Sequence, residues 1–391
     1  MRTTVGIIGA GPAGLLLGRL LQNAGIRSVV LESRDRPYVE RRQRAGILEQ
    51  GTADALRAAG VGARLDREGL EHTGIELRFD RRRHRVDLPA LTGSRTVTVY
   101  AQTEVCKDLI AARLADGAPL LFEAQALAVE DAGTDRPRVR YRHRGREAVL
   151  DCDYVVGCDG FRGVSRAAIP AALTRTYERT YPYGSLGILA DVAPSHDELV
   201  YARGDRGFAL LSMRSPSVTR AYLQVPAGTE AGAWSHEEIW DELDRRLEVE
   251  DPAWRLARGP VTAASVTPMR SHVHEPMRHG RLFLAGDAAH IVPPTGAKGL
   301  NLAVGDVVTF ARALTAHLDT GDPALLDAYS ATCLRRVWQA ERFSYAMTTL
   351  LHRAPGATGF DDRIQLAGLD RLTTSRAAET ELAEAYTGFP F

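Results

Sequence analysis

The chain has 391 residues, of which 45% are hydrophobic and 25% are charged, values ordinary for a globular enzyme. Lys plus Arg and Asp plus Glu both total 49, and this balance argues against a nucleic-acid partner, which normally shows a basic excess. No apolar run is long enough to span a bilayer, so no membrane partner is expected, and no apolar signal core follows Met1. The four cysteines (Cys106, Cys152, Cys158 and Cys333) form no C-x-x-C pair. We therefore expect a soluble, cytoplasmic protein of two interlocked domains or one large α/β unit.

The first 32 residues are typical of a βαβ unit. A strand at residues 5–8 leads into Gly9-Ala10-Gly11-Pro12-Ala13-Gly14, a G-x-G-x-x-G match that opens a helix from about residue 13 to 21. A second strand, residues 28–31, ends at Glu32, which can accept hydrogen bonds from ribose hydroxyls. The glycines permit a tight turn, close approach of a pyrophosphate and close helix packing, and the helix N-terminus favours phosphate. The pattern predicts a dinucleotide site, with Gly9, Gly11, Ala13 and Gly14 as contacts, without separating FAD from NAD.

The remaining elements follow in chain order. Residues 40–44 look like a loop, and a helix is expected at about 52–59. Strands are expected in 74–87, 96–100, 139–141 and 149–156, with a helix at about 104–114, antiparallel β-structure from 181 to 226, a strand at 282–285 and helices from about 299 onward. The predicted fold is α/β: a discontinuous Rossmann-like nucleotide-binding domain with a parallel sheet (1–73, 97–180, 270–320), an inserted, mainly antiparallel β-sheet substrate domain (74–96, 181–269) and a helical C-terminal or interface region (321–391).

Two later segments favour FAD as the cofactor. Residues 281–301 place Asp287 just after a strand and continue through a glycine-rich turn into a helix. Residues 158–166 contain Asp159-Gly160, a pair that taken singly is an ordinary turn. The three motifs in this order resemble the group A flavoprotein monooxygenases. In that family the Asp bonds the ribityl chain, and a helix N-terminus, which stabilises negative charge, faces the flavin.

This resemblance implies a reaction. In the family NAD(P)H reduces FAD, O2 then forms a C4a-hydroperoxide, and an electron-rich aromatic ring attacks its distal oxygen, while the protein orients the ring and excludes water. Within the family the chain is most similar to the 4-hydroxybenzoate hydroxylases, nearly end to end, at 44–51, 96–104, Tyr201, 212–222, 281–301, 333–336 and Tyr386. The similarity implies conversion of 4-hydroxybenzoate to 3,4-dihydroxybenzoate with O2 and NADPH or NADH, by a homodimer like its relatives.

The substrate side chains are expected on a hairpin. Period-two alternation in residues 207–214 puts Ser212 and Arg214 on one face, and Arg220, Tyr222 and Gln224 share a face on the returning strand. Arg suits a bidentate carboxylate clamp, although an exposed hairpin with a solvated Arg is the commoner arrangement. The resemblance implies that Ser212, Met213, Arg214, Tyr222 and the Pro294 carbonyl contact the substrate, and that Tyr201, Tyr386 and His72 pass the phenol proton to solvent. Tyrosine and histidine pKa values of about 10 and 6.5 suit such a path, but on its own His72 would be an ordinary surface histidine.

The resemblance also implies the cofactor contacts. For FAD these are Glu32, Arg42, Gln43, Arg44, Ala45, Gly46, Ile47, Gln102, Asp159, Arg220, Asp287, Gly299, Leu300 and Asn301, and Arg220 is implied to help the flavin swing. For NAD(P)H they are Ser33, Arg34, Tyr38, Arg44, Arg162, Arg166 and Arg270. Relatives often carry Ser at position 13, and well-known NADPH users place other residues at 33, 34 and 162, so the preference between NADPH and NADH stays open.

Three alternatives remain. The same machinery would serve 4-aminobenzoate or 3-hydroxybenzoate, although an amine would not need the Tyr201–Tyr386–His72 path. A non-catalytic flavoprotein that binds an aromatic acid is a rival from another class. His272, His274, His279 and His290 lack a complete ligand set at metal spacing, so no metal is expected.

Overall fold

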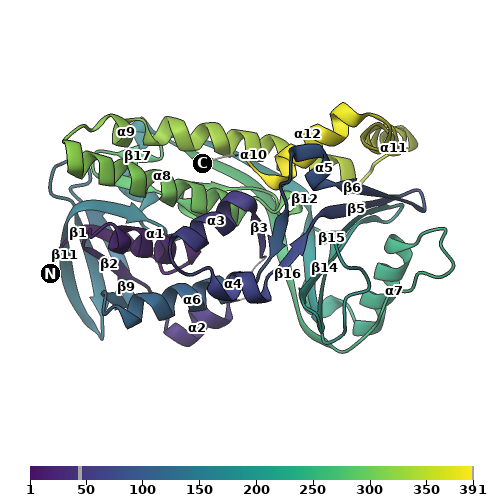
Figure 1. Ribbon diagram of the computed structural model, residues 1–391, viewed down its shortest axis with the longest axis horizontal. Coiled ribbons are helices and arrows are strands. Elements are labelled where there is room, and N and C mark those ends of the chain that lie inside the picture. The colour runs from purple at the N-terminus through teal and green to yellow at the C-terminus, as the bar shows by residue number, and fades with distance from the viewer. Residues whose placement is uncertain (43–45, 390–391) are drawn as a thin grey trace.

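The computed structural model describes residues 1–42 and 46–389, and its two large sheets lie at opposite ends of the molecule (Figure 1). The first sheet has the order β17-β18-β11-β1-β2-β8, with β10 and β9 continuing from β11. Its central strands are parallel and nearly all apolar, as expected of a sheet buried on both faces. The strands are β1 (Arg2–Ile8), β2 (Ser28–Leu31), β8 (Leu120–Leu121), β9 (Ala124–Glu130), β10 (Arg138–His143), β11 (Arg146–Gly157), β17 (Arg278–His279) and β18 (Leu282–Leu284).

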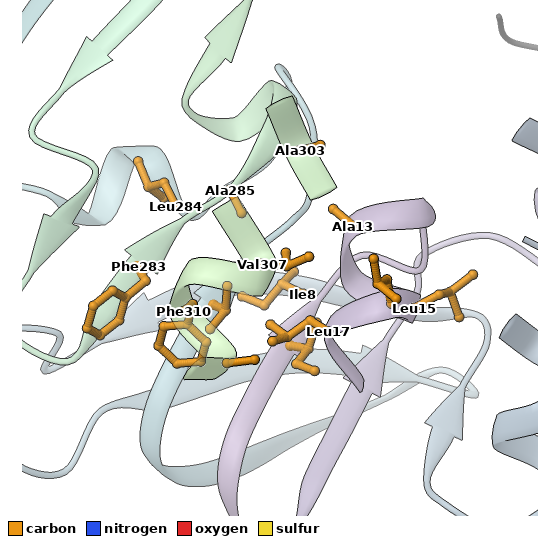
Figure 2. Close-up of a cluster of buried hydrophobic side chains, with 14 of the residues drawn as sticks. Ile8, Ala13, Leu15, Leu17, Phe283, Leu284, Ala285, Ala303, Val307 and Phe310 are labelled. Carbon is orange, nitrogen blue, oxygen red and sulfur yellow. The ribbon is translucent and has the colours of Figure 1, made fainter. Parts of the chain in front are cut away.

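Helices bury the central strands of this sheet. Figure 2 shows α1 and α8 packed together beside β1 and β18, with Leu17 of α1 facing Val307 and Phe310 of α8 and Leu15 on the other side of α1. These side chains are almost completely buried, and each contributes about 1.5–3 kcal/mol by leaving water. The helices around the sheet are α1 (Pro12–Asn23), α2 (Arg36–Arg41), α3 (Gln50–Ala58), α4 (Ala63–Glu68), α6 (Gln102–Ala115) and α8 (Gly299–Thr320).

The second sheet has the order β19-β16-β12-β15-β14-β13-β5-β6 and is mostly antiparallel. Period-two alternation gives it two different faces. Leu186, Leu211 and Leu223 pack on one face against α7 (His236–Leu247), whereas Tyr201, Leu210 and Tyr222 lie on the other. The strands are β5 (Gly74–Phe79), β6 (Arg82–Asp87), β12 (Arg175–Ala190), β13 (Leu199–Gly204), β14 (Gly207–Ser215), β15 (Val218–Pro226), β16 (Val261–Glu275) and β19 (His290–Ile291).

A long C-terminal helix connects the two halves. The first part of α10 (Tyr329–Leu351) contributes Cys333 and Val337 to the core of the first sheet. Its last turns contribute Phe343 and Met347 to the core under the second sheet. The other elements are a small sheet of β3 (Ile47–Glu49), β7 (Val97–Val99) and β4 (Leu70–His72), the helices α5 (Leu88–Thr92), α9 (Ala324–Asp327), α11 (Gly359–Thr374) and α12 (Arg376–Thr387), and the 3₁₀ turns η1 (Arg166–Ala168), η2 (Ala171–Leu173), η3 (Ala231–Ala233), η4 (Gly286–Ala288) and η5 (Pro294–Gly296).

The predicted α/β class, with parallel and antiparallel sheets and a helical C-terminal region, is confirmed, with three local corrections. Residues 40 and 41 belong to helix α2, which Asp35 caps by accepting a hydrogen bond from the Tyr38 N–H. The antiparallel β-structure expected from 181 to 226 begins earlier, at Arg175, and continues beyond residue 226 in β16. Helix α7 was missed, although Ser235 and Glu238 form a capping box. The predicted domain boundaries stay a prediction. Every helix in the described ranges is too short or too polar to cross a membrane.

Candidate functional site

The glycine-rich loop is shaped by backbone contacts. Gly9 has φ of +102°, and its N–H donates to the Leu31 carbonyl at 2.7 Å. A Cβ on Gly14 would lie 2.0 Å from the Gly9 carbonyl oxygen, so only glycine lets α1 pack this closely. At Gly11, by contrast, an added Cβ would meet no atom within 4 Å. Helix α1 starts here with no side-chain cap and no acidic residue in its first turn, which leaves its N-terminus available to an anion.

Glu32 connects this loop to the next turn. Its Oε2 accepts the Ala10 N–H at 2.7 Å, and its Oε1 accepts the Arg34 N–H at 2.8 Å and the Ser33 hydroxyl at 3.2 Å. The side chain is 9% exposed. Glu32 therefore shapes the loop, in addition to the ribose contact expected of it.

Asp159 supplies a buried acceptor near the loop. Its Oδ2 accepts the Ser165 N–H and hydroxyl, at 2.9 and 2.8 Å, whereas its Oδ1 is buried with no partner among the described residues. Burial raises the pKa of this carboxyl. The backbone of the preceding residue, Cys158, lies where a Cβ on Gly9 would fall, so this segment and the glycine-rich loop touch.

A second helix N-terminus belongs to α8. The helix follows Lys298 with no side-chain cap and no acid in its first turn, and an added Cβ at Gly299 would meet nothing within 4 Å. The Asn301 side chain accepts the Glu49 N–H and donates to the carbonyls of Ile47 and Ala297, which fixes β3 against α8. Asn301 was expected to contact FAD, but its side-chain amide already forms hydrogen bonds with Glu49, Ile47 and Ala297 of the protein.

These features fit a dinucleotide with a flavin. The open space at Gly11, the orphaned Asp159 oxygen and the two uncapped helix starts offer hydrogen bonds to phosphate, ribityl and pyrimidine groups. Arg42 and Asp287 are exposed, and Gln102 and Leu300 are half-buried at the starts of α6 and α8. The predicted contacts Gln43, Arg44 and Ala45 lie outside the described residues.

A cavity of about 620 Å³ opens beneath the second sheet. It brings together all six predicted substrate residues, which come from β13, β14, β15 and η5. The predicted flavin contacts Gly46, Ile47 and Arg220 lie in the same wall. The lining residues are Gly46, Ile47, Val99, Ser185, Tyr201, Phe208, Leu210, Ser212, Met213, Arg214, Arg220, Tyr222, Met269, Pro294, Thr295, Ala297 and His352.

Strand register arranges these side chains in rows. Ser212 pairs with Arg220 in the first row. In the second row Tyr201 pairs with Leu210, which pairs with Tyr222. Ser212 and Arg214, predicted to share a face of their strand, both line the cavity from β14, and Arg220 and Tyr222, predicted to share a face of the next strand, both line it from β15. The Pro294 carbonyl already accepts the Ala297 N–H at 3.0 Å and retains a second lone pair for a ligand.

One end of the cavity carries a buried phenol pair. The Tyr201 and Tyr386 hydroxyls lie 3.0 Å apart, and the two rings meet edge to face with their centroids 6.0 Å apart. Burial raises the pKa of both phenols, so both are protonated at neutral pH. The pair can exchange a proton with a third hydroxyl in the cavity without leaving its place.

The other end carries Arg214, at the end of β14 beyond Ser212. Burial, together with the nearby charge of Arg220, lowers the pKa of Arg214 to about 10. Within residues 1–42 and 46–389 no carboxylate forms an ion pair with Arg214. A half-buried guanidinium at a cavity wall can bind an anion, since a buried charge is costly unless an opposite charge pairs with it.

His72 lies in a different setting from the one expected. It ends β4, is 1% exposed and has no hydrogen-bond partner for either ring nitrogen in the described part of the chain. Burial lowers its pKa to about 4, so the ring is neutral at pH 7. His72 was expected to release a proton to solvent, but its ring is buried by the described residues. No direct hydrogen bond joins it to Tyr386 in the described part of the chain.

The predicted NAD(P)H residues form two groups. Arg166 and Arg270 both lie over the Phe161 ring at 4.8 Å, and His272 meets that ring edge-on. Arg162 is exposed beside them. In the second group Arg34 stacks on Tyr38 at 5.0 Å, next to exposed Ser33.

Two of the four histidines considered for a metal have carboxylate partners, whereas both ring nitrogens of His274 have no hydrogen-bond partner among the described residues. His290 bonds Asp306 at 2.7 Å and His272 bonds Glu178 at 2.8 Å. No group of three possible metal ligands occurs in the ranges that the structure describes.

Several cavity residues were not foreseen from the sequence. Phe208 and Leu210 follow the same period-two pattern as Ser212, which would have placed them on its face. Ser185, Met269 and His352 come from segments far away in the chain, and no local pattern points to them.

Comparison with known proteins agrees with this geometry. A family model described as FAD binding domain matches residues 2–344. The chain is 49% identical to p-hydroxybenzoate hydroxylase of Acinetobacter baylyi over 391 residues, covering 100% of this chain and 96% of that protein. It is 28% identical to rifampicin monooxygenase of Streptomyces venezuelae, over 83% of this chain and 67% of the other. The structure superposes on that of p-nitrophenol 4-monooxygenase from Pseudomonas putida over 100% of both chains, with a TM-score of 0.83. The two sequences are only 20% identical, so this likeness shows a shared fold.

The predicted FAD-binding fold is thus confirmed, together with the dependence on FAD and NAD(P)H that it implies. This chain belongs to the FAD-dependent aromatic hydroxylases, the flavoprotein monooxygenase family that includes p-hydroxybenzoate hydroxylase.

Proposed function

We propose that this enzyme converts 4-hydroxybenzoate, NAD(P)H, O2 and a proton to 3,4-dihydroxybenzoate, NAD(P)+ and water. One observation carries the proposal: a single cavity holds a guanidinium without a carboxylate partner at one end and a buried phenol pair at the other. A ligand with a carboxylate and a hydroxyl at opposite ends of one aromatic ring would place the carboxylate at the guanidinium and the hydroxyl at the phenol pair. The 49% identity to a named p-hydroxybenzoate hydroxylase supports the same substrate.

The carboxylate end fixes the ring in place. Arg214 would pair with the carboxylate, and the hydroxyls of Ser212 and Tyr222 would donate further hydrogen bonds to it. Met213 and the Pro294 carbonyl would close the wall beside the ring. This grip orients one edge of the ring toward the flavin contacts Gly46, Ile47 and Arg220.

The phenol end controls the proton. Tyr201 would accept the hydrogen bond of the substrate hydroxyl and pass the proton to Tyr386, since the two oxygens already lie 3.0 Å apart. Removing that proton makes the ring more electron-rich, which oxygen insertion requires. His72, neutral and buried, would receive the proton beyond Tyr386 through a rearrangement or a bridging water.

The cofactor contacts follow the motifs. FAD would be held by Gly9, Gly11, Ala13, Gly14, Glu32, Arg42, Gln102, Asp159, Asp287, Gly299, Leu300 and Asn301, together with residues 43–47 and Arg220. Reduced FAD, when bound, would activate O2, which supplies the oxygen atom that is inserted into the ring. The electron donor would dock at Phe161, Arg166 and Arg270, with Arg162, Ser33, Arg34 and Tyr38 nearby. We also propose a cytoplasmic homodimer, as the resemblance implies, which light scattering of the purified protein tests.

Product analysis tests the function. The FAD-loaded protein is incubated with 4-hydroxybenzoate in parallel with NADH and NADPH, and with 4-aminobenzoate and 3-hydroxybenzoate as competing substrates. We expect 3,4-dihydroxybenzoate from 4-hydroxybenzoate and faster donor oxidation in its presence. Product from another benzoate alone would reassign the substrate, and a yellow protein that forms no product with any of them would contradict the enzyme.

A further inference from the structure

Three buried polar side chains follow one another along α10, and the chemistry described above uses none of them. They are Glu341, Ser344 and Thr348, spaced about one helical turn apart, and we call them the α10 row. Glu341 is 6% exposed, and the other two are completely buried. Polar groups are costly to bury unless they form hydrogen bonds, so the partners of this row show what it can do.

One end of the α10 row reaches the substrate cavity. The Thr348 hydroxyl donates to the Thr295 hydroxyl at 3.1 Å, and Thr295 of the turn η5 lines the cavity next to Pro294. A hydroxyl oxygen that accepts one hydrogen bond keeps its own proton for another. Thr295 can therefore donate that proton to a group in the cavity.

The other end of the α10 row meets strands β16 and β12. The Ser271 hydroxyl donates to Glu341 Oε2 at 2.8 Å, and the Tyr181 hydroxyl lies 3.2 Å from the Ser271 oxygen. Since Ser271 gives its only hydroxyl proton to Glu341, Tyr181 is the donor in the second bond. The exposed Arg179 lies over the Tyr181 ring, 5.7 Å from its centroid. These donors thus point from beneath an exposed residue toward Glu341.

Two orphaned oxygens lie between the ends. Glu341 Oε1 and the Ser344 hydroxyl are buried and have no hydrogen-bond partner in residues 1–42 and 46–389. A serine inside a helix often bonds back to the preceding turn, but Ser344 does not. It lies against Gly296 of η5, where an added Cβ would be 2.5 Å from the Ser344 oxygen. A proton on Glu341 Oε1, donated to Ser344 directly or through one water, would satisfy both atoms.

The surroundings of Glu341 favour a protonated carboxyl. In the described part of the chain no Lys or Arg forms an ion pair with it, and burial raises its pKa to about 7. The ionisable groups that face it are Tyr181 of β12 and His290 of β19, and the His290 ring is paired with Asp306 at 2.7 Å. At neutral pH such a carboxyl can both release and regain a proton.

The proposed reaction consumes one proton in forming water, whereas the phenol pair removes a proton from the cavity. We propose that Glu341 holds the proton that the reaction consumes and delivers it to the cavity along the α10 row and Thr295. The O–H bond of the carboxyl breaks, each hydroxyl accepts one proton and passes one on, and the last proton ends in the water that the reaction forms. This inference rests on the proposed function.

The carboxylate left behind regains its proton from the opposite side, through Ser271 and Tyr181. Glu341 touches the cavity only through other side chains, so it is a proton-holding residue that acts at a distance from the substrate. Its route is separate from the Tyr201–Tyr386 pair, which carries the substrate proton away.

Infrared spectroscopy of the FAD-loaded protein, without electron donor, tests whether Glu341 holds a proton. We expect the C=O band of a carboxylic acid that disappears as pH rises through about 7 and is missing from Glu341→Gln, which keeps an acceptor for Ser271. The difference between wild type and variant separates Glu341 from Asp159, a second buried carboxyl with a raised pKa. If no band between about pH 5 and pH 8 depends on Glu341, the proposal is overturned.

A single turnover tests the delivery. The reduced complex with 4-hydroxybenzoate is mixed rapidly with O2, and product is measured over time. A positioned proton donor contributes about 100-fold or more, and water would replace part of it, so we expect Glu341→Gln to form product at least about 10-fold more slowly at pH 7. The ratio of wild-type to variant rate should fall as pH rises through about 7, because the wild-type carboxyl then loses its proton.

Two further variants separate delivery from a structural effect. Ser344→Ala interrupts the α10 row beside an intact acid, so it should slow product formation about as much as Glu341→Gln and keep the infrared band. Glu237→Gln on the exposed side of α7 is the control and should keep the wild-type rate and band.

The outcomes distinguish the two proposals. A rate within twofold of wild type in Glu341→Gln or in Ser344→Ala overturns the delivery while the proposed function stands. If Glu341→Gln does not fold, Ser344→Ala decides by the same criterion. If the wild-type protein forms no product from 4-hydroxybenzoate, the proposed function fails and the delivery fails with it.

Discussion

The glycine-rich loop and the aromatic cavity prepare for their ligands in opposite ways. The loop uses backbone: Gly9 and Gly14 remove side-chain volume, and the start of α1 presents N–H groups. The cavity uses side chains that the surrounding packing keeps buried, above all Arg214, Tyr201 and Tyr386, and burial shifts the pKa of each. The residues that shape the loop thus lie in one short segment, whereas the cavity depends on contacts between segments far apart in the chain.

The largest effect is expected from adding volume to the loop. Gly14→Ala places a methyl group 2.0 Å from the Gly9 carbonyl, so we expect complete loss of bound FAD and an apoprotein destabilised by about 2–3 kcal/mol. Flavin absorbance after gel filtration and urea unfolding measure the two effects. Gly11→Ala should keep the fold, because its methyl group meets no protein atom within 4 Å. It should weaken FAD binding, because the methyl group would occupy the space expected for the pyrophosphate. Gly232→Ala is the neutral control, and full FAD retention in Gly14→Ala would contradict the loop geometry.

Next in size is the loss of the phenol pair. Tyr201→Phe removes the group that would accept the substrate proton, so we expect product formation to fall about 100-fold or more. Binding of 4-hydroxybenzoate should weaken about 10-fold at most, since one neutral hydrogen bond is lost. Single-turnover product analysis and ligand titration distinguish these effects, with Tyr154→Phe in the first sheet as control. A wild-type product yield from Tyr201→Phe removes this residue from the proton path.

The carboxylate clamp gives an intermediate effect. Arg214→Gln removes a charged hydrogen bond worth about 1.5–3 kcal/mol, so the Kd of 4-hydroxybenzoate should rise about 10- to 150-fold. The neutral ligand 4-methylphenol, which has no carboxylate, should lose little affinity in the same titration. An equal loss for both ligands would mean that the substitution distorts the cavity, and no loss for either would exclude Arg214 from the site.

The smallest effect concerns His72 and pH. Its pKa is about 4 when folded and 6.5 when unfolded, so the unfolded chain binds more protons between these values and stability falls as pH decreases through this window. Between pH 7 and pH 5 this costs about 2 kcal/mol. His72→Gln should reduce the loss of unfolding free energy over that interval by this amount, as measured by urea titration. His236→Gln on the exposed side of α7 should behave as wild type, and an unchanged loss in His72→Gln would show that His72 is not a buried neutral base.

The same comparison explains how much could be predicted from the sequence. The βαβ unit and its glycines were located correctly because the turn, the strand and the helix are encoded within some thirty residues. Arg220 and Tyr222 were placed on one face of their strand because strand alternation is a local property. Tyr201 and Tyr386, 185 residues apart, were paired only through family resemblance.

What could not be predicted depends on tertiary packing. The burial of His72 results from its pairing with β7 and from neighbours that no local pattern reveals. His352 reaches the cavity because it follows the end of α10 and stacks on Phe208, and Gln224 of the adjacent strand β15 fixes that end by donating to the Arg353 carbonyl. Helix α7, however, begins with a capping box that the sequence shows, and it was missed in the part of the predicted β-sheet domain after residue 226.

The central claim is that one cavity holds a flavin next to a benzoate anion. The most direct test is to titrate the FAD-loaded protein with 4-hydroxybenzoate and follow the visible absorption bands of the flavin. We expect a saturable change in these bands, and the same change in Arg214→Gln only at much higher ligand concentration. A protein that retains no flavin, or flavin bands that no benzoate alters, would contradict the account.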